Sequence, residues 1–104
     1  MSVMDCASIE DVRAEIDRID RGIVALLAER EGYVRQVVRF KQTAEEVKAP
    51  QRAEQVIAKV TALASELGAD LAVTERVYRA MIAGFIEAEL ADLAARQQSA
   101  TKKV

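Results

Sequence analysis

An all-α fold of three helices, one long and two shorter, is predicted for this chain of 104 residues. Apolar residues recur every three or four positions through most of the sequence, which is the period of an amphipathic helix. Only four glycines and one proline are present, so few positions force a helix to stop. No segment alternates apolar and polar residues as a strand does. A single domain is expected, with its core at about residues 9–96 and flexible ends.

The first helix is expected at about residues 9–43. Ser8 is suited to cap its N-terminus, and Asp11 falls in its first turn, where a negative charge is favourable. One face carries an apolar seam, made of Ile9, Val12, Ile16, Ile19, Ile23, Leu26, Tyr33, Val37 and Phe40. A helix of about 35 residues is roughly 50 Å long.

The second helix is expected at residues 50–67, after a connector at residues 44–49. Pro50 suits the first position of a helix because its missing N–H has no intrahelical partner there. Gly68 suits the position after the last turn. The side expected to face inward consists of Val56, Ile57, Val60, Leu63, Ala64 and Leu67.

Asp70 or Thr74 is expected to cap the third helix, which is predicted to continue to about Arg96. Its apolar stripe consists of Val73, Val77, Met81, Ile82, Phe85, Ile86 and Leu93. Residues 97–104 are polar and are expected to form a disordered tail.

The unequal helix lengths predict a homodimer in which the long helices are intertwined. The second helix is about 27 Å long and covers only part of the first, so much of the seam would face water in a monomer. Pairing two long helices about a two-fold axis covers it, and two-fold symmetry is the commonest closed arrangement. A free-standing coiled coil is the alternative, but it does not explain Pro50, Gly68 and the two further helices.

Composition argues against several classes of protein. A net charge of −2 does not suit a nucleic-acid binder, whose phosphate contacts need a basic surface. No apolar stretch is long enough for a transmembrane helix, and the N-terminal residues do not resemble a signal peptide. The single cysteine, Cys6, cannot form an intrachain disulfide. A cytoplasmic protein is therefore expected.

The chain has no histidine, which is the commonest general base and the commonest metal ligand in proteins. It also has no cysteine cluster, no glycine-rich phosphate loop and no acidic motif with metal-ligand spacing. We therefore expect no metal and no cofactor. An enzyme of this composition would act by electrostatic stabilisation and by positioning a bound molecule.

Arg30 is the charged residue that interrupts the apolar seam. A guanidinium keeps its proton, so it is buried only against an anion or strong acceptors. This indicates either an internal salt bridge or a site for an anionic ligand. Lys41 would lie on the same face of a continuous helix, roughly 16 Å further along, and both cations could then reach one small dianion. The alternative for Lys41 is an ordinary surface lysine near a helix end.

Arg13 lies about 25 Å from Arg30 along the same helix, so within one protomer it cannot share a pocket with Lys41. An antiparallel partner helix would carry it there. The simpler alternative is an exposed ion pair with Asp17, which is four residues further on.

Arg52 and Glu89 occupy unusual positions in the two shorter helices. Arg52 lies in the first turn of its helix, where the helix dipole disfavours a cation, and this hints at a ligand contact. Its alternative partners are Glu45 and Glu54. Glu89 falls in an apolar row, so its carboxyl is expected to point into the bundle, where an ion pair with Arg30 is the alternative. The row is Ile82, Ile86, Glu89 and Leu93.

Short strings distributed along the chain resemble the all-α chorismate mutases, and are closest to the branch that contains isochorismate-pyruvate lyases. They are Arg13-Ala-Glu-Ile-Asp-Arg-Ile-Asp20, then Arg30, then Arg39-Phe-Lys41, then Ala49-Pro-Gln-Arg52. The resemblance covers about residues 9–96. It implies an intertwined dimer of three-helix protomers with two identical sites, each lined by residues of both chains.

The resemblance also implies a role for each candidate residue. Arg13 from the partner chain and Arg30 would hold the two carboxylates of a small dicarboxylate substrate. Lys41 would donate to the ether oxygen and to a carboxylate, Arg52 would close the site, and Ile86 would contact the substrate. The reaction of this family is pericyclic, which agrees with a chain that has no histidine and no cofactor motif.

Two departures from the family pattern affect the expected reaction. Glu89 stands where many members have a glutamine that donates to the ether oxygen, so Glu89 must be protonated to act as a catalytic residue beside Lys41 and Arg30. Ala49 and Ala53 stand where many chorismate mutases have acidic residues that bind the ring hydroxyl, and the lyase branch shares this loss. Chorismate mutase is the first assignment. The alternatives are isochorismate-pyruvate lyase, both activities together, or a non-enzymatic helical interaction module.

Overall fold

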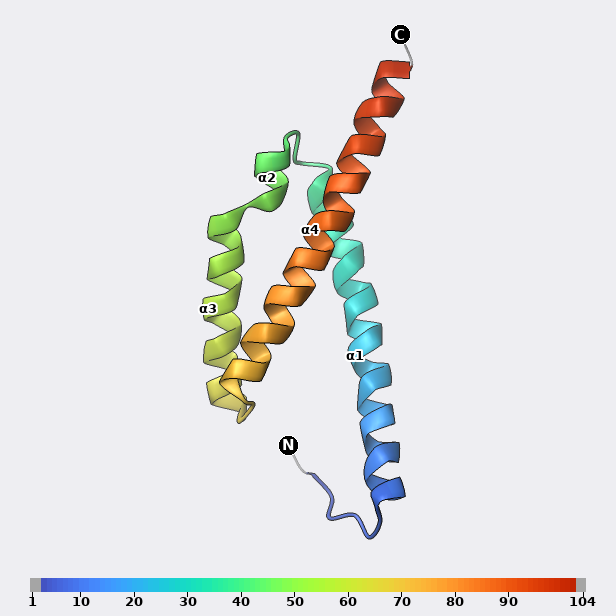
Figure 1. The fold of residues 1–104 in the computed structure, drawn as a ribbon, viewed down its shortest axis with the longest axis vertical. Helices are drawn as coiled ribbons and strands as arrows, with labels where there is room; N and C mark the ends of the chain where they lie inside the picture. Colours follow the sequence, from blue (N-terminus) through green and yellow to red (C-terminus); the bar gives the residue numbers. More distant parts are fainter. Residues whose placement is uncertain (1–2, 103–104) are drawn as a thin grey trace. The chain divides into compact units, whose positions relative to one another are not determined.

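The computed structural model describes residues 3–102, with side chains described up to residue 99. Its helices are α1 (Ile9–Val38), α2 (Ala44–Lys48), α3 (Pro50–Leu67) and α4 (Leu71–Lys102), shown in Figure 1. Residues 3–102 contain no strand, so the predicted all-α class is confirmed. The three main helices were expected, whereas α2 is an additional helix of 5 residues.

The chain divides into two compact units, one ending at Tyr33 and the other beginning at Val34, so that α1 contributes to both. The first unit is almost entirely the N-terminal part of α1. The second unit contains the end of α1 together with α2, α3 and α4.

Ser8 caps α1 as predicted, since its Oγ accepts a hydrogen bond from the backbone N–H of Asp11 at 3.1 Å. The seam of α1 is exposed in the single chain, and Ile16, Ile19 and Ile23 each retain 50% of their accessible surface. Burial of apolar surface is the main driving force of association, so a partner for this face is expected. The homodimer stays a prediction.

The expectation that the first helix continues to residue 43 is wrong, because α1 ends at Val38. The reason is the cap of the next helix. Thr43 Oγ1 accepts from the backbone N–H of Glu46 at 3.1 Å and donates to the Glu46 carboxylate at 3.3 Å. This Thr-x-x-Glu pairing starts a new helix and requires a non-helical backbone at Thr43 itself.

The ends of α3 agree with the prediction. Pro50 is its first residue, and Gly68 follows it in the left-handed conformation with φ of 78°. Donation from the Ala69 N–H to the Ala64 carbonyl at 2.8 Å completes the C-terminal turn. Asp70, rather than Thr74, caps α4, because Asp70 Oδ1 accepts from the Val73 N–H at 2.9 Å.

The third helix is longer than predicted, because α4 has 32 residues and α1 has 30. Residues 97–102 are helical, so α4 runs beyond the predicted end at Arg96. The flexibility of the C-terminal residues stays a prediction, and residues 103–104 lie outside the described part. Alanine, glutamine and lysine in this segment favour helix. Within the described residues, no helix is long and apolar enough to span a membrane.

The core of the second unit forms where α2 and α3 pack against α4. Its buried apolar residues are Val38, Val47, Ile57, Val60, Ala64 and Leu93. On the surface, an ion pair joins α3 to α4. Arg79 Nη1 and Nη2 donate to the two carboxylate oxygens of Glu54 at 2.8 and 3.1 Å, and Arg79 Nε donates to Glu75 at 2.8 Å.

Candidate active site

Four of the predicted site residues belong to the second unit. Lys41 lies in the turn after α1, Arg52 in the first turn of α3, and Ile86 and Glu89 on α4. Glu89 is buried, with 7% of its surface exposed, which confirms that α4 turns this residue inward. Ile86 and Lys41 are half-buried, and Arg52 is exposed.

The geometric argument for Lys41 fails, although its assignment to the site stays a prediction. Because α1 ends at Val38, Lys41 does not lie on a helical face shared with Arg30. Instead, the Lys41 N–H donates to the Val38 carbonyl at 3.0 Å, which closes a tight turn. This turn therefore sets the direction in which the Lys41 side chain leaves the backbone.

Arg13 and Arg30 lie on α1 in the first unit. The helix is continuous between them, so their predicted separation along the axis holds. Arg13 is exposed, and among the described side chains it forms no ion pair with Asp17. Arg30 is half-buried. Their assignment to a site that both protomers share stays a prediction.

Arg52 makes neither of the two ion pairs considered for it within the described side chains. Glu54 is engaged by Arg79 instead. The hydrogen bonds from Arg79, followed by its positive charge, hold the pKa of the Glu54 carboxyl below its ordinary value. The Arg52 guanidinium is thus available to an anionic ligand at the start of α3.

A small cavity of about 140 Å³ lies between α3 and α4 beside Ile86. Its walls are Ala53, Ile57, Arg79, Ile82, Ala83 and Ile86. Ala53 is one of the two positions at which acidic residues are expected in many chorismate mutases. The cavity is lined mainly by apolar side chains, and Arg79 is the charged residue in its wall.

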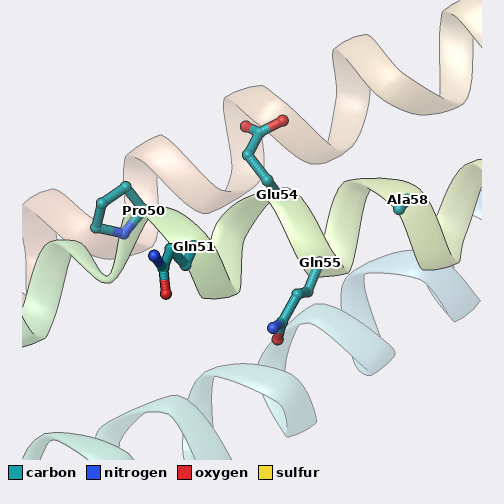
Figure 2. Close-up of a pocket in the computed structure, with 5 residues that line it drawn as sticks. All are labelled: Pro50, Gln51, Glu54, Gln55 and Ala58. Carbon is teal, nitrogen blue, oxygen red and sulfur yellow. The ribbon is translucent and has the colours of Figure 1, made fainter.

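A wider depression of about 620 Å³ runs along the outside of α3 and is lined by Pro50, Gln51, Glu54, Gln55 and Ala58. Figure 2 shows Gln51 and Gln55 extending from one side of α3 and Glu54 from the other. None of the predicted site residues lines this depression. Its size alone does not make it the site, because no convergent set of charged groups is found there.

Residues 12–90 match the chorismate mutase type II family. The isochorismate pyruvate lyase of Pseudomonas aeruginosa is 33% identical to the chain over 86 residues, which is 83% of this chain and 85% of that protein. The chain therefore belongs to the chorismate mutase type II family, and the predicted resemblance, including its position near the lyase branch, is confirmed. The matched span contains the predicted residues Arg13, Arg30, Lys41, Arg52, Ile86 and Glu89.

Sequence reasoning missed the residues that shape the turn carrying Lys41. The Thr43-x-x-Glu46 spacing is a capping signal, and it would have placed the end of α1 earlier. The sequence pattern indicates Arg96 only as the end of a helix, but its side chain reaches back to this turn. No local pattern indicates that contact, since its partners are 58 and 55 residues away in sequence.

Proposed function

We propose that this chain is a cofactor-free enzyme that converts a chorismate-type dicarboxylate in a single pericyclic step, with chorismate mutase as its primary activity. The observation that carries the proposal is the family match over residues 12–90, because every predicted cation and Glu89 fall within it. The buried position of Glu89 adds support, since a group that contacts a bound substrate is expected to face the interior of the bundle.

In the proposed mechanism, Arg30 and the partner chain's copy of Arg13 hold the two carboxylates. The ether C–O bond breaks while a new C–C bond forms, and negative charge develops on the ether oxygen. The Lys41 ammonium stabilises that charge in the transition state, and protonated Glu89 donates a hydrogen bond to the same oxygen. Binding the substrate in its reactive shape lowers the remaining barrier.

The shared site requires the proposed homodimer. Its support is the half-exposed seam of α1, which provides a long apolar face for a second copy. Arg13 and Arg30 lie far apart on one helix, so an antiparallel copy is the arrangement that brings them to one ligand.

Isochorismate-pyruvate lyase is the second candidate activity. Two observations favour it: the similarity to the lyase of Pseudomonas aeruginosa and the apolar Ala53 in the wall of the cavity beside Ile86. The same cations serve either substrate, because the breaking C–O bond places negative charge on the ether oxygen in both reactions.

Product identification separates these activities. The purified protein is incubated with chorismate and, separately, with isochorismate, and the products are resolved by chromatography. Prephenate from chorismate supports the primary assignment, and salicylate with pyruvate from isochorismate supports the second. Inactivity toward both would contradict the proposal and favour a helical interaction module.

A further inference from the structure

One guanidinium on α4 binds both ends of the turn that carries Lys41. Arg96 Nη2 donates to the Val38 carbonyl at 3.0 Å and to the Lys41 carbonyl at 3.1 Å. The Val38 carbonyl also accepts from the Lys41 N–H at 3.0 Å. A carbonyl has two lone pairs, so it can accept both bonds. The turn is thus closed by its own hydrogen bond and by Arg96.

The Arg96 side chain is well suited to this contact. Val38 is 3% exposed, and Leu93, one turn before Arg96 on α4, is 5% exposed, so the contact lies at the edge of the core, with Arg96 itself exposed. The last carbonyls of a helix carry partial negative charge, and a cation beside them is favourable. Hydrogen bonds from a charged donor are stronger than neutral ones.

Val38 anchors the start of the turn in the core, whereas the residue before Lys41 is loosely packed. Phe40 is 82% exposed, and residues 39–42 lie outside any helix. Gln97 Nε2 donates to the Gln42 carbonyl at 3.3 Å, which is a longer bond between neutral groups. Arg96 makes two hydrogen bonds from a charged donor to residues 38 and 41, and it can therefore restrict the backbone from which Lys41 extends.

We infer that Arg96 is a positioning residue for Lys41. It fixes the turn at residues 38–41, and through it the place where the Lys41 ammonium meets the developing charge on the ether oxygen. The inference rests on the proposed function. Lys41 acts most strongly in the transition state, so its misplacement lowers kcat more than it raises KM.

Arg96→Gln removes the charged fork but keeps a polar side chain. A displacement of about 1 Å in a catalytic group can cost about 100-fold in rate, so we expect kcat to fall by about 10- to 100-fold with a small change in KM. Arg96→Lys keeps the charge and can still donate, but lacks the planar guanidinium, and should recover part of the loss. Arg76→Gln, which removes an exposed arginine from the same helix, is the matched control and should leave kcat unchanged.

A double-mutant cycle tests whether Arg96 acts through Lys41. In the Lys41→Ala background, Arg96→Gln should cost little of the residual rate, because the group that it positions is gone. Circular dichroism and thermal midpoints show which variants keep the fold. If Arg96→Gln does not fold, the same cycle is measured with Arg96→Lys. A smaller loss of kcat is then expected, and it should again vanish in the Lys41→Ala background.

An unchanged kcat in the folded Arg96 variants, or an equal loss with and without Lys41, would overturn the inference while leaving the proposed function intact. The proposed function fails differently. In that case the unmutated protein has no turnover of either substrate, or Lys41→Ala is as active as the unmutated protein.

Discussion

At the level of single residues, a few charged side chains occupy positions that are unusual for charged groups. Glu89 is buried on α4, and Lys41 sits in a turn that the charge of Arg96 supports. An internal carboxyl is stabilised as the neutral acid by burial and as the carboxylate by neighbouring cations. The protonation state of Glu89 therefore controls whether it can donate to a substrate oxygen.

A pH profile tests this role of Glu89. Only the protonated form donates, so activity should be highest on the acidic side of neutral and should fall as the pH rises through the pKa of Glu89. Glu89→Gln keeps the shape and supplies a permanent donor. Its kcat should be flat over the same range. A flat profile in the unmutated protein, or an unchanged slope in the variant, would assign Glu89 a structural role.

Arg30→Ala and Lys41→Ala should each lower kcat/KM by at least about 100-fold, because in the proposed site each removes a charge that stabilises the dianionic substrate or its transition state. Steady-state assays with the preferred substrate measure this effect, and circular dichroism checks that the helices are retained. Near-normal activity in both variants would show that the site has been assigned to the wrong residues.

Ala49 is strained in the structure, with φ of 35° and ψ of 61° between α2 and α3. A left-handed conformation costs alanine about 1–2 kcal/mol, whereas glycine adopts it freely but loses more entropy on folding. Ala49→Gly should therefore raise the free energy of unfolding by roughly 0.5–1 kcal/mol. Urea denaturation measures the change, and a destabilised variant would show that the left-handed turn is not formed.

At the scale of the elements, the sequence predicted best where a single residue type dictates the backbone. Pro50 and Gly68 bounded α3 correctly. The end of α1 was placed too late because the apolar period continued through Val37 and Phe40, while the cap at Thr43 decided the boundary. The interior position of Glu89 followed from spacing on one helix, whereas the contact of Arg96 with the Lys41 turn joins distant segments and leaves no local pattern.

The cap at Thr43 should contribute measurable stability. Thr43→Ala removes the acceptor for the Glu46 N–H and should destabilise the protein by about 1 kcal/mol. Thr43→Ser keeps the hydroxyl and is the matched control. Thermal and urea denaturation of the two variants give the comparison, and equal stability would mean that α2 does not depend on this cap.

The surface ion pair between α3 and α4 predicts a pH-dependent stability. Arg79 lowers the pKa of folded Glu54 below the ordinary 4.5, so the pair contributes fully above that value and its contribution is lost as the pH falls through the folded pKa. At neutral pH the unmutated protein should have a slightly larger free energy of unfolding than Glu54→Gln. This difference should disappear in acid. Glu45→Gln, an exposed neighbour outside the pair, should show no such trend.

At the scale of the whole molecule, the long apolar seam of α1 predicts an obligate homodimer, because half-exposed isoleucines on one face would otherwise meet water. Sedimentation at micromolar concentration should give twice the mass of the 11.4 kDa chain. Ile19→Glu places a charge in the seam and should produce monomers and loss of activity. Val24→Glu, at a residue that is 62% exposed and outside the seam, is the control. A folded monomer of the unmutated protein would remove the basis for a shared site.

The most direct test of the central claim follows purified enzyme and chorismate in the presence of excess chelator. We expect stoichiometric conversion to prephenate, undiminished by the chelator, and loss of that conversion in Lys41→Ala. Formation of salicylate and pyruvate from isochorismate under the same conditions would show that the protein is a pericyclic enzyme whose primary activity is that of the lyase. If neither substrate turns over, or if turnover is unchanged in Lys41→Ala, the protein is not a pericyclic enzyme that uses Lys41.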